Sequence, residues 1–202
     1  MKFRTVRTAL VLLAIGMVGT QAGTAANSIA DEVREHWKDT RNMMMTIAGA
    51  IPEDKLDYKP VPEVRSFRDM LEHMVEDTAV HVGYSAGVSR EESRRAVAKY
   101  AHAKTKAEFL KGLDASYDYG DKVLADLTDQ NALDMVSGMR GERMTRIMAY
   151  MHALEDIVDH YGNLVVYLRL NGVVPPSTAA RNAERGQQQE HEHGEAGEQH
   201  KH

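Results

Sequence analysis

The chain has 202 residues, 43% of them hydrophobic and 27% charged, which is enough for one globular domain with a real core and some appended segments. Its formal net charge of −5, with no basic cluster and no interleaved aromatic residues, argues against nucleic acid as a partner. The absence of cysteine excludes disulfides, a lipoprotein anchor and a cysteine nucleophile. Any chemistry must therefore come from His, Asp, Glu, Tyr or a bound metal.

Residues 1–26 have the pattern of a secretory signal peptide. Three basic residues within the first seven positions precede a short apolar run, 9–18, and small residues follow at 24–26. The apolar run is shorter than the roughly 20 residues that a membrane span needs. We therefore predict a periplasmic or secreted protein that has no membrane contact after cleavage. A retained N-terminal anchor is the alternative.

Apolar residues at helical spacing predict four amphipathic helices within residues 27–177. Ser28, Ser66 and Thr105, each followed three residues later by an acidic residue, mark the starts of the first three helices. No segment shows the alternation of a strand, and residues 87–103 and 129–142 are expected to be connections, the first with a short surface helix. The predicted fold is all-α, a four-helix bundle.

The fourth predicted helix, which starts at Arg146, has two rows of residues along its length. The first row is apolar, has alternating spacings of three and four, and is expected to face the other helices: Met144, Ile147, Met151, Leu154, Val158, Tyr161, Val165 and Leu168. The second row lies beside it: Ala149, Ala153, Asp156, His160 and Tyr167. Asn171-Gly172 and then Pro175-Pro176 are expected to end this helix.

Residues 178–202 are polar and rich in Gln, Glu, Gly and His, so we expect a disordered tail. The tail has four histidines, for which two interpretations are open, weak binding or buffering of a transition metal and simple solvation: His191, His193, His200 and His202.

A metal site is predicted where the second and fourth helices meet. Asp156 and His160 are four residues apart and hence neighbours on one helix face, and His73 lies at the flank of the second helix's apolar face. Imidazole and carboxylate groups bind divalent ions such as Zn, Ni, Mn or Fe, and three ligands leave an open position for chemistry. Spacing alone leaves the alternative that each histidine is a hydrogen-bonded structural group. His81, near the apolar face of the second helix, is interpreted as such a core histidine.

The motif D156xxxH160YGNLVVYLRLNGVVPPS resembles the C-terminal signature of the DinB/YfiT-like family of metalloenzymes, and VPEVRSFRDMLEHMVED with His73 resembles the family's second helix. The resemblance covers residues 28–177. It implies a four-helix bundle with a metal held by one histidine of the second helix and two of the last. Here Asp156 replaces one of these histidines, which favours harder ions such as Mn or Fe or else marks a degenerate site.

The resemblance implies a metal-binding protein that acts as a metal-dependent hydrolase or transferase on an unknown small molecule, and the signal-peptide pattern indicates that this protein is exported. The alternative is a non-catalytic bundle with a degenerate metal site, which serves as a binding or stress module or, through its tail, as a metal buffer. Members of the family often pair as dimers, so a homodimer is expected, although no feature of the sequence identifies an interface.

Overall fold

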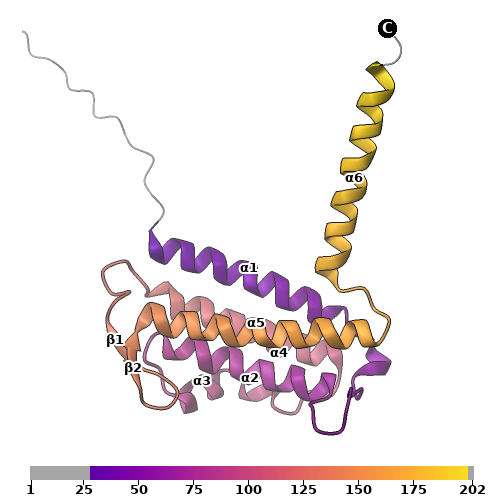
Figure 1. Cartoon of the computed structure of the whole chain (residues 1–202). Coiled ribbons are helices and arrows are strands. Elements are labelled where there is room, and N and C mark those ends of the chain that lie inside the picture. Colours follow the sequence, from indigo (N-terminus) through magenta and orange to yellow (C-terminus); the bar gives the residue numbers. More distant parts are fainter. Residues whose placement is uncertain (1–27, 200–202) are drawn as a thin grey trace, which may run out of the picture.

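The computed structural model describes residues 28–199, so the predicted signal peptide and the tail residues His200 and His202 lie outside the described part. The described part is mostly helical (Figure 1). Its α-helices and its two strands have the following bounds: α1 Ile29–Gly49, α2 Phe67–Tyr84, α3 Arg90–Val97, α4 Lys106–Ala125, β1 Met135–Ser137, β2 Arg143–Thr145, α5 Arg146–Leu170 and α6 Pro176–Gln199. Short 3-10 helices lie at Glu53–Lys55 and Ala98–Tyr100.

The helix starts follow from local capping. The Ser66 hydroxyl accepts a hydrogen bond from the Asp69 backbone N–H, and the Asp69 carboxylate accepts one from the Ser66 N–H, which together form a capping box for α2. Thr105 and Glu108 form the same arrangement at α4, and Ser28 caps α1. At the other end of α5, Gly172 has φ +70°, a left-handed conformation that glycine adopts without strain. These boundaries agree with the predictions.

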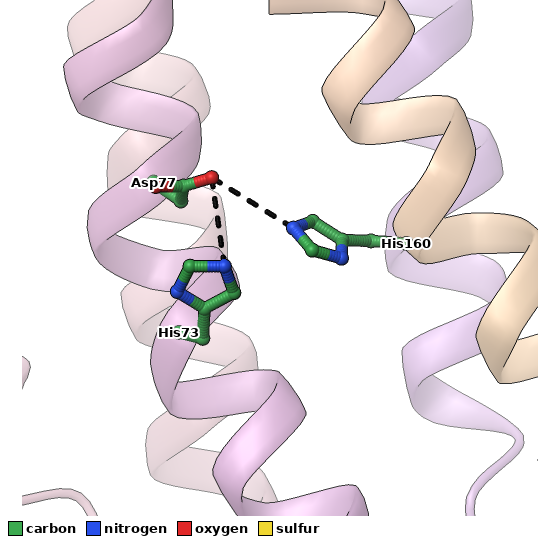
Figure 2. Close-up of side chains that lie close together, drawn as sticks. All are labelled: His73, Asp77 and His160. Carbon is green, nitrogen blue, oxygen red and sulfur yellow. Dashed lines mark ion pairs between the residues drawn. The ribbon is translucent and has the colours of Figure 1, made fainter. Parts of the chain in front are cut away.

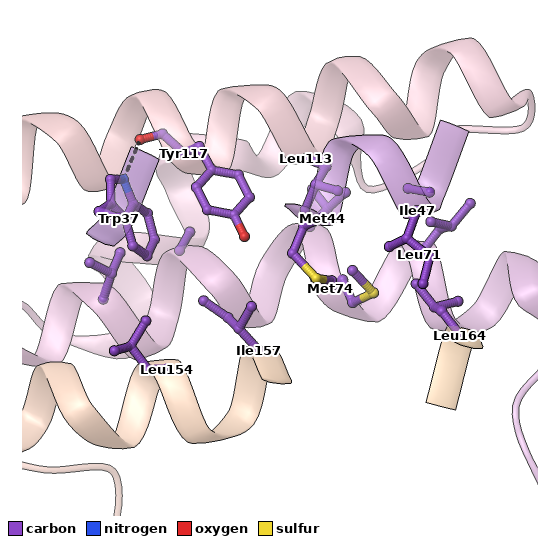
Figure 3. Packing of buried hydrophobic residues seen from close by; sticks show 14 of the residues in the cluster. Trp37, Met44, Ile47, Leu71, Met74, Leu113, Tyr117, Leu154, Ile157 and Leu164 are labelled. Carbon is purple, nitrogen blue, oxygen red and sulfur yellow. Dashed lines mark hydrogen bonds between the residues drawn. The ribbon is translucent and has the colours of Figure 1, made fainter. Parts of the chain in front are cut away.

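Helices α1, α2, α4 and α5 enclose one hydrophobic core (Figure 3). The indole of Trp37 packs against the ring of Tyr117, with centroids 4.7 Å apart, and its N–H donates to the Tyr117 carbonyl. A methyl group added at Gly120 would lie 2.1 Å from the Trp37 ring, so the indole needs glycine at this point of α4. Tyr150 of α5 joins the same cluster and donates its hydroxyl to the carbonyl of Val33.

Helices α2 and α5 run antiparallel and are tied together at both ends. The Arg146 guanidinium donates to the Ser85 carbonyl, which joins the start of α5 to the end of α2. The Tyr167 hydroxyl donates to the Arg65 carbonyl, which joins the end of α5 to the segment that precedes α2. These bonds fix the relative register of the two helices.

The buried face of α5 differs from the predicted one. Met151 and Val158 of the predicted apolar row are 43% and 53% exposed, whereas Ala149, Ala153 and His160 of the second row are buried. The sequence of α5 is apolar over more than half of its circumference, so the 3–4 spacing fits more than one rotation of the helix. Packing against α2 selects the rotation that places the row containing His160 inside.

Two further expectations were wrong in part. Residues 135–145 form an antiparallel hairpin in which Val136 pairs with Met144, although no strand was expected there. Residues 176–199 form helix α6, whereas the expected tail had no regular structure; Pro176 at the first helical position and many Ala, Arg, Glu and Gln residues favour a helix. This helix projects away from the other helices (Figure 1). The short surface helix expected in residues 87–103 is α3.

Within residues 28–199, none of the helices combines the length and the apolar character that a membrane span requires.

Candidate metal site

Five side chains capable of binding a metal meet between α2 and α5. Their sequence positions explain the convergence, because residues four apart on a helix lie on nearly the same face. Three come from α2 at successive four-residue intervals and two from α5 at the same interval: His73, Asp77, His81, Asp156 and His160.

The Asp77 carboxylate lies at the centre of the group. Its Oδ2 atom is 3.6 Å from His73 Nε2 and 3.7 Å from His160 Nε2 (Figure 2). The same oxygen is 3.5 Å from His81 Nε2, and His160 Nε2 is 3.5 Å from Asp156 Oδ2. These separations exceed the usual hydrogen-bond range for N–H···O. They match the separation of roughly 3.4 Å between two ligand atoms that share one ion through bonds of about 2.1 Å.

Three buried polar atoms of this group lack a hydrogen-bond partner among residues 28–199. Asp156 Oδ2 and both ring nitrogens of His160 are shielded from solvent and form no hydrogen bond. An unsatisfied buried polar atom costs about 1–3 kcal/mol, so folded proteins seldom keep several in one place without a ligand. The side chains present therefore fit a divalent cation by number, chemistry and spacing.

In the absence of a metal, burial and the proximity of the two carboxylates shift the pKa values of Asp77 and Asp156 in opposite directions. Burial and the adjacent Asp77 raise the pKa of Asp156 to about 7. Burial alone would raise the pKa of Asp77, but contacts with His160 and Asp156 hold it well below its usual range. Asp77 raises the pKa of His160, whereas burial lowers the pKa of His73 and of His81. Asp77 thus stays ionised, whereas Asp156 is mostly protonated below about pH 7 and mostly ionised above it.

All three predicted ligands belong to this group. The rings of His73 and His160 lie edge to face with centroids 4.8 Å apart, and Asp156 adjoins His160. Their role as metal ligands stays a prediction. The sequence reasoning did not identify Asp77 or His81 as part of the site. Their positions four and eight residues after His73 were the available signal, and His81 points at the Asp77 carboxylate instead of into an apolar core.

A cavity of 260 Å³ adjoins the group on the His81 side. Its walls come from the end of α2, the start of α5 and the β1–β2 connection, and the residues that line it are His81, Tyr84, Gly138, Met139, Arg140, Glu142, Met144, Ala149 and His152. Arg140 and Glu142 bring charges of both signs, while the methionines and Ala149 provide apolar contact. His152 of α5 is exposed and faces this cavity. A small molecule in the cavity would lie next to the candidate metal ligands.

Three of the solved structures that share this fold are bacterial proteins. A DinB-like protein from Bacillus subtilis is 20% identical, with 70% of this chain and 92% of that chain covered and a TM-score of 0.56. A DinB-like protein from Bacillus cereus is 13% identical, with 74% and 96% covered and a TM-score of 0.59. A protein assigned to the DinB family from Exiguobacterium sibiricum is 18% identical, with 71% and 91% covered and a TM-score of 0.54.

No protein of curated function matches the chain. The model of the DinB family matches residues 23–193, which is most of the sequence. The chain belongs to the DinB family.

Proposed function

We propose that this DinB family protein binds a divalent metal between α2 and α5 and uses it to hydrolyse, or to transfer a group from, a small molecule. The observation that carries the proposal is the set of buried, unpartnered atoms of Asp156 and His160 beside the Asp77 carboxylate. We take α1, α2, α4 and α5 as a four-helix bundle whose rigid packing holds these side chains in register.

The ligand chemistry favours Zn, Ni, Mn or Fe. Imidazole nitrogens suit Zn, Ni and Fe, whereas carboxylates suit Mn. The two carboxylates, one of which replaces a histidine of the family pattern, therefore shift the preference toward Mn and Fe. His73, Asp77 and His160 would hold the ion, with Asp156 adjacent to it.

The chain's own residues would position the substrate. A divalent ion supplies Lewis acidity to a water or to a substrate oxygen. The cavity beside His81 would bind the substrate and limit the access of bulk water. Arg140 in its wall would attract an acidic group of the substrate, and the Glu142 carboxylate, whose pKa backbone hydrogen bonds lower, would attract a basic one.

The test compares turnover in the metal-loaded and metal-free protein. A panel of chromogenic esters, amides and phosphoesters is incubated with the full chain loaded with Mn²⁺ or Zn²⁺, with the chelated protein, and with the His160→Ala variant. The proposal predicts metal-dependent turnover that chelation and His160→Ala both abolish. Bound metal without turnover on any substrate class would instead support the non-catalytic binding module.

The tail requires a control of its own. His191, His193, His200 and His202 are replaced with Gln in the full chain, which removes the tail's imidazoles and keeps its length. The proposal predicts that this variant still binds the metal between α2 and α5. Loss of all metal in this variant would support the metal-buffering alternative.

We also propose that the protein is exported, because residues 1–26 have the composition of a signal peptide. Cell fractionation followed by N-terminal sequencing should find the mature chain outside the cytoplasm and starting near Asn27. A cytoplasmic protein that retains Met1 would refute this part of the proposal.

A further inference from the structure

Helices α2 and α5 carry the same spaced motif, a histidine, an aspartate four residues later and a histidine four residues after that. The two copies are His73-Asp77-His81 and His152-Asp156-His160. With 3.6 residues per turn, each motif extends along one face of its helix for about 12 Å.

The antiparallel register brings the two motifs together in reverse order. His73 of one motif meets His160 of the other, with ring centroids 4.8 Å apart. Asp156 groups with Asp77 and His81 in the middle of the arrangement. At the far end His81 and His152 line the same cavity. The six side chains therefore form a ladder along the two helices, with His73 and His160 at one end, Asp77 and Asp156 in the middle, and His81 and His152 at the end that lines the cavity.

Two sets of metal-binding atoms lie along this ladder and share one residue. His73, Asp77 and His160 form one set, in which the ligand atoms all lie within 4.8 Å of one another, and Asp77, His81 and Asp156 form the second. A carboxylate has two oxygens and can bind two ions at once. Two-metal sites, with ions roughly 3.5–4 Å apart, are built in this way.

We propose that α2 and α5 hold two divalent ions that share the carboxylates of Asp77 and Asp156. The inner ion is bound by His73 and His160, and the outer ion is bound by His81 and completed by His152. This inference rests on the proposed metal site and extends it from one ion to two.

The surroundings of the two sets differ in a way that suits different roles. In the inner set the His160 and Asp77 side chains are each only 9% exposed, and His73, 29% exposed, forms the edge of this set that reaches solvent. His81 lines the cavity and His152 is exposed there, so the outer set opens toward a bound small molecule. The rival arrangement is a single ion at the inner set, with His81 and His152 serving only as cavity wall.

Metal stoichiometry separates these two arrangements. The full chain, with its four tail histidines replaced by Gln, is freed of metal, dialysed against excess Mn²⁺ and then against buffer, and analysed for metal by mass spectrometry. We expect two ions per chain. The double variant His81→Gln/His152→Gln should bind one ion, and His102→Gln, at an exposed histidine remote from the ladder in sequence, should still bind two.

Electron paramagnetic resonance provides a readout that depends on the sharing of ligands. Two Mn²⁺ ions that share carboxylates couple magnetically, so the fully loaded chain should give a coupled spectrum. The His81→Gln/His152→Gln variant should give the spectrum of an isolated ion. Circular dichroism melts of the metal-free variants establish that each one is folded.

The outcomes distinguish this inference from the proposed function. One ion per chain in the parent protein overturns the two-ion site and leaves the proposed function intact, whereas no bound ion overturns both. Two ions that persist in the His81→Gln/His152→Gln variant overturn the assignment of the outer ligands. If the chain binds two Mn²⁺ ions but the spectrum shows no magnetic coupling, the claim that the two ions share carboxylates is wrong.

Discussion

The Asp77 carboxylate is the side chain that faces most of the other candidate ligands, so Asp77→Asn is the sharpest perturbation of the site. The substitution keeps the shape of the side chain and removes its negative charge. Loss of an outer partner that orients a metal ligand already lowers metal affinity by about 10–100-fold, so we expect loss of Asp77 as a ligand to lower it by at least about 100-fold.

The expected effect on thermal stability follows from linkage. At a metal concentration 100 times Kd, binding stabilises the folded chain by about 2.7 kcal/mol, and after a 100-fold loss of affinity only about 0.4 kcal/mol remains. At about 2–4 °C per kcal/mol for a domain of this size, the metal-induced rise in Tm should shrink by about 5–9 °C. The assay is a thermal melt of each protein with and without Mn²⁺, in the background that lacks the tail histidines. Only the metal-dependent difference is compared.

Asp159→Asn is the matched control, because Asp159 is an exposed aspartate on α5 whose carboxylate accepts a hydrogen bond from Asn163 rather than facing the site. It removes the same charge close to the site and should leave the metal-induced rise in Tm nearly intact. If Asp77→Asn retained the full metal-induced rise, the central position of Asp77 in the metal site would be wrong.

The remaining predictions concern pH, metal preference and packing. Because the pKa of Asp156 is raised to about 7 and the pKa of His160 is also raised, the metal must displace a proton from each side chain at lower pH. The metal affinity should therefore rise by at least about tenfold per pH unit between pH 5.5 and 6.5 and less steeply above pH 7, and an affinity that does not change with pH in isothermal titration would contradict this prediction. Asp156→His adds a nitrogen ligand and should increase the ratio of bound Zn²⁺ to Mn²⁺ in competition dialysis, whereas an unchanged ratio would show that Asp156 does not contact the ion. Gly120→Ala should destabilise the fold by about 1–3 kcal/mol in urea unfolding, because its methyl group would overlap the Trp37 ring. The matched control Gly162→Ala, which meets no atom within 4 Å in the interior of α5, should stabilise the fold by about 0.5–1 kcal/mol, and equal effects of the two substitutions would refute the packing argument.

Local signals in the sequence predicted the ends of the main helices well. The capping box of Ser66 and Asp69 involves residues only three apart, so the hydrogen bonds that start α2 are readable without tertiary information. The same holds for the end of α5, where Gly172 adopts a positive φ. The motifs in the second and last predicted helices also suggested the DinB family. The match of the family model to residues 23–193 confirms this prediction.

The parts that were missed depend on contacts between distant segments. Packing on α2 decides which face of α5 is buried. Val158 and Ile157 are adjacent apolar residues that both fit a helical apolar spacing, yet Val158 is exposed and Ile157 is buried. The β1–β2 hairpin is three residues long on each side, too short for an alternation to be visible in the sequence. Asp77 and His81 were also missed because their place in the site depends on tertiary structure. Only the antiparallel packing of α2 against α5 brings these two side chains close to Asp156 and His160.

The structure also changes the interpretation of Asp156, the position at which this chain departs from the family pattern. From the sequence alone, a carboxylate in place of a histidine is compatible with a degenerate site. The structure shows that Asp156 lies beside His160 and that a second carboxylate, Asp77, faces the same histidine. The site is thus richer in potential ligands than the three residues that the sequence predicted.

The location of the bound ion tests the central claim most directly. Crystals of the full chain loaded with Mn²⁺ would be measured for anomalous scattering at a wavelength where manganese contributes strongly. We predict an anomalous peak between α2 and α5, within about 2.0–2.3 Å of Asp77 Oδ2 and His160 Nε2. An ordered site between these helices without such a peak, or a peak only at the tail histidines, would contradict the account.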